Sequence, residues 1–351
     1  MENLYLFFVL ALGFLAIADL IVGVSNDAVN FLSSAIGSKA VSFKKIMIIA
    51  SFGIALGAIF SSGMMEVARK GIFNPELYYF DEIMIIFLAV MITDILLLDF
   101  FNTLGLPTST TVSIVFELLG AAVSIAAYKI WENSQSIYEI ITYINYSKAT
   151  QIILGILLSV FIAFTIGAIV QWVSRLILSF DFKRNSKIIS SIFGGIAITS
   201  ITYFILIKGI KGTSYSEITF DYFQGETINN LIERNALQII IYLTLIWSLI
   251  SFFLIEVYRT NIYKIIILVG TFALALAFAG NDLVNFIGVP IAAWQSYEAW
   301  TISGVPADQL SMGILSSKVE TPNLILFFAG AIMVITPVSY THLTLPTKRI
   351  V

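Results

Sequence analysis

One short polar pattern occurs twice in a chain that is otherwise very apolar. Asn26-Asp27-Ala28-Val29-Asn30-Phe31 returns as Asn281-Asp282-Leu283-Val284-Asn285-Phe286, with five of six positions identical. On a helix Asn26 and Asn30 share one face and Asp27 lies beside them, so amide oxygens and a carboxylate can converge on a hard cation such as sodium. A charge at membrane depth costs at least ~2.5 kcal/mol and normally marks a transport path, which favours this interpretation over a purely structural hydrogen bond.

A second pattern sets hydroxyl side chains at a break between two apolar segments. It reads Leu104-Gly105-Leu106-Pro107-Thr108-Ser109-Thr110-Thr111. Gly105 and Pro107 end the first segment, and the four hydroxyls open the second. Such hydroxyls can simply cap a helix. Inside a bilayer the same helix start is also an anion site, because unpaired N–H groups and the positive end of the helix dipole suit tetrahedral oxygens.

Two further sets of residues each allow two interpretations. Glycines beside the repeated pattern either let the helix unwind or serve close helix packing; they are Gly23, Gly280 and Gly288. Acids elsewhere in apolar segments either line an ion path or pair with polar neighbours. These acids are Asp19, Asp94, Asp99 and Glu117.

The composition places the chain in a membrane. Its 351 residues are 58% hydrophobic and 12% charged, with a mean hydropathy of +0.94, whereas soluble proteins carry about 25% charged residues. A net charge of −3 and the lack of any basic run longer than a pair argue against nucleic acid binding. The absence of Cys excludes thiolate sites, and the single His342 lies near the end.

Apolar segments of this length and composition can cross a bilayer only as helices. The first has an acid, Glu2, and no basic flank or cleavage site, so we expect a retained helix and not a signal peptide. The expected spans are 1–24, 46–65, 83–101, 110–127, 149–173, 188–207, 236–257, 265–279 and 323–336.

Loop charges orient these spans. Lys39, Lys44 and Lys45 follow the first span and a basic cluster occupies 175–187, so both loops are expected in the cytoplasm and the N-terminus outside. The acidic stretch 66–82 suits the outside. The two copies of the Asn-Asp pattern then enter the membrane from opposite sides. The expected fold class is therefore an all-α polytopic membrane protein, an inverted-topology repeat transporter with broken helices and a helical hairpin.

The expected organisation follows the chain. Residues 1–148 form the first inverted repeat with a hairpin at 83–127, residues 149–257 supply connecting helices, and 258–336 begin an incomplete second repeat. The polar stretch 209–233 is expected to be an external loop with a short surface helix from Thr227. From Pro337 the composition changes abruptly, and 337–351 resembles adaptor-derived read-through, so we expect a non-native tail.

Together these patterns resemble one family. Asn-Asp-x-x-Asn in each half, Pro-x-Ser-Thr-Thr at a helix break and the stretch 66–72 (Glu-Val-Ala-Arg-Lys-Gly-Ile) are similar to the inorganic phosphate transporter (PiT) family of cation-coupled phosphate symporters. The resemblance covers about residues 10–130 and 265–300. It implies a non-enzymatic, multi-pass protein of a bacterial-type inner (plasma) membrane that carries inorganic phosphate with sodium by alternating access. A homodimer is left open.

The resemblance also implies which residues hold the substrates. A carboxylate should not touch phosphate, so the Asn-Asp pairs are assigned to sodium, while amides and hydroxyls donate to phosphate oxygens. The expected sodium ligands are Asn26, Asp27, Asn281 and Asp282. The expected phosphate ligands are Thr108, Ser109, Thr110, Thr111, Asn30 and Asn285. Sodium is a co-transported substrate, and no catalytic residue or cofactor is expected.

Departures from the family keep alternatives open. Many relatives have His where this chain has Val112, and an acid near the position of Ile54, which leaves sodium and proton coupling both open. Sulfate or another tetrahedral oxyanion would also fit hydroxyls and a helix start. From other classes, an intramembrane aspartyl protease needs two buried carboxylates that share a proton, and a membrane scaffold would have no reason to repeat a costly charge.

Overall fold

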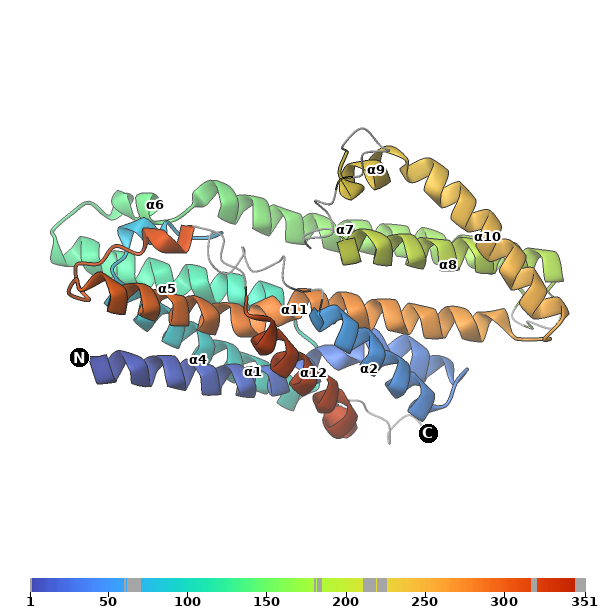
Figure 1. Ribbon diagram of the computed structural model, residues 1–351, viewed down its shortest axis with the longest axis horizontal. Coiled ribbons are helices and arrows are strands. Elements are labelled where there is room, and N and C mark those ends of the chain that lie inside the picture. Colours follow the sequence, from blue (N-terminus) through green and yellow to red (C-terminus); the bar gives the residue numbers. More distant parts are fainter. Residues whose placement is uncertain are drawn as a thin grey trace. The chain divides into compact units, whose positions relative to one another are not determined.

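The computed structural model describes residues 2–59, 61, 71–179, 181, 185–210, 219, 226–316 and 321–344, and all regular elements within them are helical (Figure 1). The long helices are α1 (Glu2–Ser38), α2 (Phe43–Ile59), α4 (Phe80–Leu104), α5 (Thr110–Glu132), α7 (Tyr146–Ile177), α8 (Lys187–Ile210), α10 (Ala236–Glu256), α11 (Ile262–Ser303) and α12 (Asn323–Thr344). Short helices are η2 (Pro75–Leu77), η3 (Ile137–Glu139), α6 (Ile140–Tyr143), α9 (Ile228–Arg234) and η7 (Gly313–Ser316).

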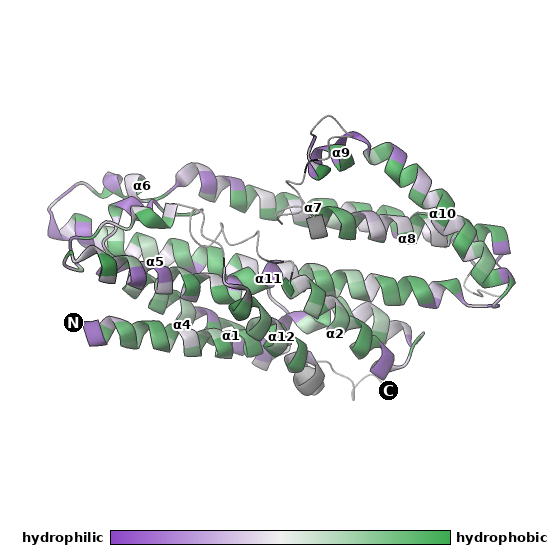
Figure 2. Ribbon diagram, viewed as in Figure 1, coloured by the Kyte–Doolittle hydropathy of each residue, from purple (hydrophilic) through white to green (hydrophobic). Residues whose placement is uncertain are grey.

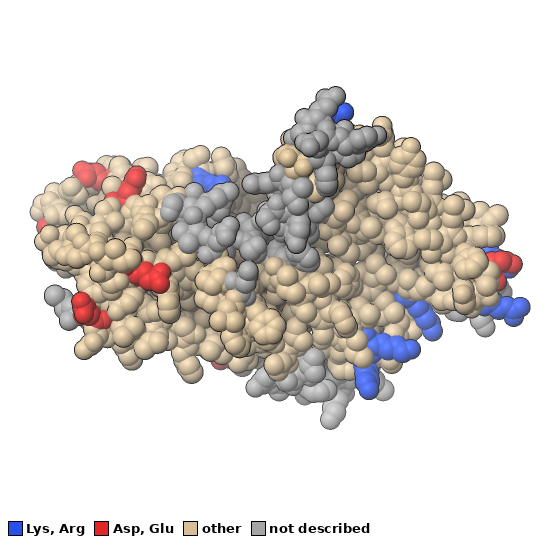
Figure 3. Space-filling view, in the orientation of Figure 1, with Lys and Arg blue, Asp and Glu red and all other residues tan. Residues whose placement is uncertain are grey.

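Seven of the described helices are long and apolar enough to cross a membrane: α1, α4, α5, α7, α8, α10 and α11. Their residues are hydrophobic along most of their length (Figure 2), and long stretches of the face in Figure 3 carry no charged side chain. The 37 residues of α1 and the 42 of α11 correspond to about 55 and 63 Å, well over the ~30 Å of a hydrocarbon core. The expected all-α, multi-pass membrane fold is confirmed.

The helices that carry the Asn-Asp patterns are continuous. The expected ends at residues 24 and 279 are wrong, because α1 and α11 run through both patterns. Unwinding beside the glycines, the first of the two interpretations, does not occur in these continuous helices. Gly23 instead lets α1 approach α11, since a Cβ there would overlap the Phe286 ring. A Cβ on Gly280 would lie 3.4 Å from the Gly57 carbonyl oxygen. Gly23 and Gly280 therefore serve close packing, the second of the two interpretations.

The break in the fold lies instead at the expected hairpin. The hairpin is formed by α4 and α5, which pack side by side (Figure 1). It covers residues 80–132 and is longer at both ends than the expected 83–127. Gly105 ends α4 in the left-handed conformation, at φ +68°, which glycine adopts without strain. Ser109 begins α5 as its N-cap and accepts a hydrogen bond from the Val112 N–H at 3.3 Å.

The residues of the helical hairpin and of both patterns, except Phe31, belong to one compact unit, formed by Met1–Asn30, Ile54–Leu154 and Phe278–Val351. Its core joins the first half of α1, the hairpin and the second half of α11. Phe80 stacks on Trp300 with ring centroids 4.8 Å apart, and Tyr5 meets both rings edge-on. Burial raises the pKa of Tyr78, whose hydroxyl donates to the Ala122 carbonyl at 3.0 Å.

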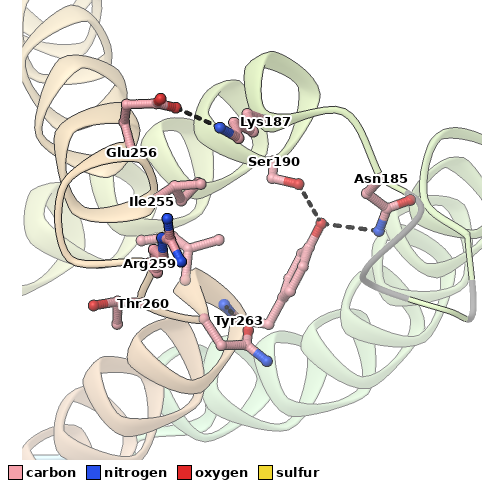
Figure 4. Close-up of a pocket in the computed structure, with 10 residues that line it drawn as sticks. Asn185, Lys187, Ser190, Ile255, Glu256, Arg259, Thr260 and Tyr263 are labelled. Carbon is pink, nitrogen blue, oxygen red and sulfur yellow. Dashed lines mark hydrogen bonds and ion pairs between the residues drawn. The ribbon is translucent and has the colours of Figure 1, made fainter.

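The second unit, Phe31–Gly53 with Gly155–Ala277, is held by closely packed helices. A Cβ on Gly195 of α8 would overlap Ser248 of α10, so the two helices meet with almost no side chain between them. A polar pocket lies at one end (Figure 4), where the Tyr263 hydroxyl bonds Ser190 at 2.9 Å and accepts from Asn185 at 3.1 Å.

Several expected segments lie wholly or partly outside the described residues. They include most of the 66–72 pattern, the end of the 46–65 span and most of 209–233. The short helix expected from Thr227 is confirmed as α9, with Thr227 as its N-cap. Helix α12 continues through Pro337 to Thr344 instead of ending at 336. The foreign origin of 337–351 stays a prediction.

Candidate functional site

The tip of the hairpin is fastened to the middle of α1 by Asn26. The Asn26 amide nitrogen donates to Asn102 Oδ1 at 2.8 Å and to the Leu106 carbonyl at 3.2 Å, while its Oδ1 accepts from the Thr108 N–H at 2.8 Å. Asn102 in turn donates to the Val22 carbonyl at 2.9 Å. Asn26 is only 3% exposed. These bonds fix where the irregular backbone of residues 105–109 lies against α1.

This placement brings the start of α5 to the two repeated aspartates. The Thr110 hydroxyl lies 3.5 Å from Asp27 Oδ2 and 3.4 Å from Asp282 Oδ1, so both carboxyl groups lie beside the same hydroxyl. All three side chains are at least 95% buried. Figure 1 shows α1 and this part of α11 running in opposite directions, so equivalent carboxylates meet from two opposed helices. Two buried carboxylates and a hydroxyl are suitable oxygen ligands for a hard cation.

The asparagines of the second copy complete the network from α11. Asn285 donates to Thr110 Oγ1 at 3.2 Å and to Thr111 Oγ1 at 3.0 Å. Asn281 donates to Thr111 Oγ1 at 3.1 Å and to Asp282 Oδ1 at 3.2 Å. The hydroxyls of α5 therefore lie between both copies of the pattern, which were more than 250 residues apart in the chain.

The start of α5 adds backbone donors to the same place. Ser109 caps the Val112 N–H, and the N–H groups of Thr110 and Thr111 fall in the first turn, where no intrahelical acceptor exists. The first turn of a helix carries a partial positive charge of about +0.5. An anion at this helix start would therefore meet N–H and O–H donors on one side and, through a bound cation, the two carboxylates on the other.

The ten residues expected to bind substrates are not placed alike. Six form the network: Asp27, Thr110, Thr111, Asn281, Asp282 and Asn285. Asn26 and Thr108 hold the tip, with both polar groups of the Asn26 amide in hydrogen bonds. Ser109 is an exposed cap, and the exposed Asn30 has one weak contact, 3.5 Å to Asp27.

Two residues at or beside the site were missed from the sequence: Asn102 belongs to it, and Ser113 lies one turn beyond it. The Asn102 side chain accepts a hydrogen bond from the Asn26 amide. The Ser113 hydroxyl, one turn beyond Thr110 on α5, is hydrogen-bonded to the carboxyl groups of Asp94 and Glu117. A signal for each exists. Asn102 is a polar residue at the end of an apolar segment, three positions before Gly105, and Ser113 lies one helical turn before Glu117 on the same face.

The sequence of the chain is similar to those of known proteins. The model of the phosphate transporter family matches residues 23–342. A protein of Thermococcus kodakarensis named as a phosphate permease is 28% identical over 92% of this chain and 72% of its own length. A protein of Plasmodium falciparum named as a sodium-dependent phosphate transporter is 31% identical over 46% of this chain and 22% of its own.

A solved structure described as the sodium-dependent phosphate transporter has the same fold. It superposes with a TM-score of 0.69 at 19% identity, covering 97% of this chain and 77% of that one. These findings confirm the resemblance drawn from the Asn-Asp and Pro-x-Ser-Thr-Thr patterns. They also exclude the enzyme alternative, which the two facing aspartates by themselves do not. The chain belongs to the phosphate transporter family.

Proposed function

We propose that the chain carries inorganic phosphate together with sodium across the membrane by alternating access, at the site between α1, α5 and α11. One observation carries the proposal. Asp27 and Asp282, equivalent acids of the two repeated patterns, meet at the Thr110 hydroxyl, next to the first turn of α5. Two facing carboxylates favour a cation, and a helix start rich in hydroxyls favours a tetrahedral anion, so one site provides for both substrates.

The contacts suggest how the roles divide. Asp27 and Asp282 bind sodium with Thr110, and Thr111 with Asn285 and the first-turn N–H groups binds phosphate. Asn281 contacts both the sodium ligands and the phosphate ligands, since it donates to Asp282 and to Thr111. Asn26 acts by positioning the tip. Sodium entering with phosphate would supply about 2.3 kcal/mol per charge per 100 mV of membrane potential.

The inverted repeat belongs to this proposal. Asn285 donates to a hydroxyl of the hairpin, whereas Asn30, the residue at the equivalent position of the first pattern, is exposed. Asn26 accepts from the hairpin backbone, whereas Asn281, at the equivalent position of the second pattern, is exposed. Asn30 is the equivalent of Asn285 in the other copy of the pattern, and the proposal retains it as a phosphate ligand.

The proposed orientation in an inner (plasma) membrane, with the N-terminus outside, has a direct test because the chain contains no Cys. Lys44→Cys should react with a membrane-impermeant maleimide only from the cytoplasmic side, and Tyr138→Cys only from outside; both positions are exposed. The reverse pattern would show that the topology is inverted. Cross-linking of the same single-Cys proteins would report a homodimer.

Transport is tested by uptake of labelled phosphate into proteoliposomes with and without an inward sodium gradient. We expect sodium to stimulate uptake, and Asp27→Asn and Asp282→Asn each to abolish the stimulation without preventing membrane insertion. Asp308→Asn, an exposed acid beyond α11, is the matched control. Sodium-stimulated uptake that survives both substitutions would refute the site. Sodium-dependent binding of labelled phosphate to the purified protein separates a binding defect from a transport defect.

Two competing assignments are resolved by the same assay. Sulfate has the same tetrahedral oxygens, so inhibition by unlabelled sulfate at equal concentration would favour a broader oxyanion carrier over a phosphate carrier. Val112 stands where many relatives have His, and uptake driven by a pH gradient in the absence of sodium would favour proton coupling.

A further inference from the structure

A second polar cluster lies among three membrane helices, away from the proposed phosphate site. Asp19 of α1 and Asp94 of α4 are fully buried, and Glu117 of α5 joins them with Ser113. The carboxyl groups of Asp19, Asp94 and Glu117 are close enough to interact electrostatically. The hairpin and α1 therefore bring three acids together within the membrane. If each were charged, each would cost at least about 2.5 kcal/mol at the membrane centre.

The contacts of Ser113 require a proton on one of these acids. Its hydroxyl oxygen lies 2.5 Å from Asp94 Oδ1 and 2.7 Å from Glu117 Oε1, the distances of short O–H···O bonds. A serine hydroxyl has one hydrogen to donate, so it can donate to only one of the two oxygens. The other contact is a hydrogen bond only if that carboxyl group is protonated and donates to the serine oxygen.

Asp19 requires a second proton. Both of its oxygens are buried and have no donor among the described residues, and the same holds for Asp94 Oδ2 and Glu117 Oε2. A fully buried carboxylate with no donor on either oxygen is held as the neutral acid, because its charge would be left unpaired in an apolar interior. Asp19 therefore carries a proton of its own.

None of the ion pairs in the part of the chain that the structure describes involves these three acids. Ion pairs among the described residues use other acids, with Lys129 on Glu82, Lys187 on Glu256 and Arg234 on Glu226. Among the described residues, Asp27 is a further acid close enough to Asp94 to interact with it electrostatically, and Asp282 lies beside Asp27. In the part of the chain that the structure describes, no three carboxylates are arranged to hold a metal ion.

We propose that Asp19, Asp94, Glu117 and Ser113 form a proton-binding site that holds two protons at neutral pH, distinct from the sodium and phosphate site. The site lies about two helical turns from Asp27 along α1. Its proton occupancy sets the negative charge beside Asp27. The proposal does not depend on phosphate transport, since protonation can be measured on the purified protein without any substrate.

Infrared difference spectroscopy tests it. Protonated carboxyl groups have a C=O stretching band separate from that of carboxylates and shifted by deuterium exchange. At neutral pH the wild-type protein minus the Asp19→Asn/Glu117→Gln double variant should show this band with the intensity of two carboxyl groups. In the double variant Asp94 would accept from the new Asn amide and from Ser113, and would ionise. Glu132 is an exposed acid at the end of α5, the helix that also carries Glu117. Glu132→Gln is therefore the matched control and should show no difference band.

The outcomes are distinct. No difference band at neutral pH would overturn the proposal, and so would a band that saturating sodium removes, because the cluster would then be a sodium site. If the double variant does not elute as a folded protein, each single variant should lose about half of the band. Loss of sodium-stimulated uptake in Asp27→Asn leaves this result unchanged, so the two proposals fail separately.

Discussion

Replacing Asn26 with alanine is expected to release the hairpin tip from α1. The substitution removes three hydrogen bonds, two donated by the amide and one accepted from Thr108. Side-chain hydrogen bonds in membrane proteins average about 0.6 kcal/mol, and a buried N–H left without an acceptor, as at Thr108, adds about 1–3 kcal/mol. Asn26→Ala should therefore lower the free energy of unfolding by about 3 kcal/mol.

The assay is thermal unfolding of the purified protein in detergent, followed by tryptophan fluorescence, with Asn30→Ala as the control. Asn30 is the same residue type one turn along α1 and has only the 3.5 Å contact to Asp27. Asn26→Ala should unfold at a clearly lower temperature than Asn30→Ala. Equal unfolding temperatures would refute the reasoning, since the hydrogen bonds would then contribute nothing.

Sodium distinguishes positioning from ligation. A bound ion stabilises the folded state by mass action. If Asn26 positions the tip, its replacement lowers the unfolding temperature in the absence of sodium. A loss of stability seen only in sodium would mean that Asn26 is a sodium ligand, as first expected. A double-mutant cycle with Asn102→Ala should give a coupling energy of about 0.5–2 kcal/mol.

Two other substitutions test the helix contacts. Gly23→Ala should destabilise by about 1–3 kcal/mol through overlap with Phe286, while Gly13→Ala on the same helix, with nothing within 4 Å of its Cβ, should not; equal unfolding temperatures would show that α1 and α11 do not meet at Gly23. Tyr263→Phe removes two hydrogen bonds at the Figure 4 pocket and should cost about 1–3 kcal/mol, and an unchanged unfolding temperature would contradict the contacts drawn there.

Much of the fold was predictable because the membrane restricts the choices. Apolar stretches long enough to span gave the helices, and Gly105 with Pro107 gave the hairpin. Helix ends were less predictable. Residues Ser25 to Asn30 are polar enough to suggest the end of a span, but in α1 their polar groups meet the hairpin and α11, so the helix continues to Ser38.

The candidate site was predictable where a pattern is repeated and not where its members are scattered. The duplicated Asn-Asp pair identified Asp27 and Asp282, and the network contains both. Nothing in the sequence relates Asp19, Asp94 and Glu117, because they are brought together only by the packing of three helices. The glycines were misinterpreted for a similar reason, since whether Gly23 unwinds or packs depends on where Phe286 lies.

The fastening at Asn26 has a mechanical consequence. The hairpin tip is bound to α1 by four hydrogen bonds of 2.8–3.2 Å through Asn26 and Asn102, three of them at 2.8–2.9 Å. Its hydrogen bonds to α11, among the described residues, run through threonine hydroxyls at 3.0–3.4 Å. Any motion that exposes the site should therefore carry α1 and the tip together and separate them from α11. The seam along which this part of the protein opens would then run between Thr110 and Asp282, through the middle of the paired aspartates.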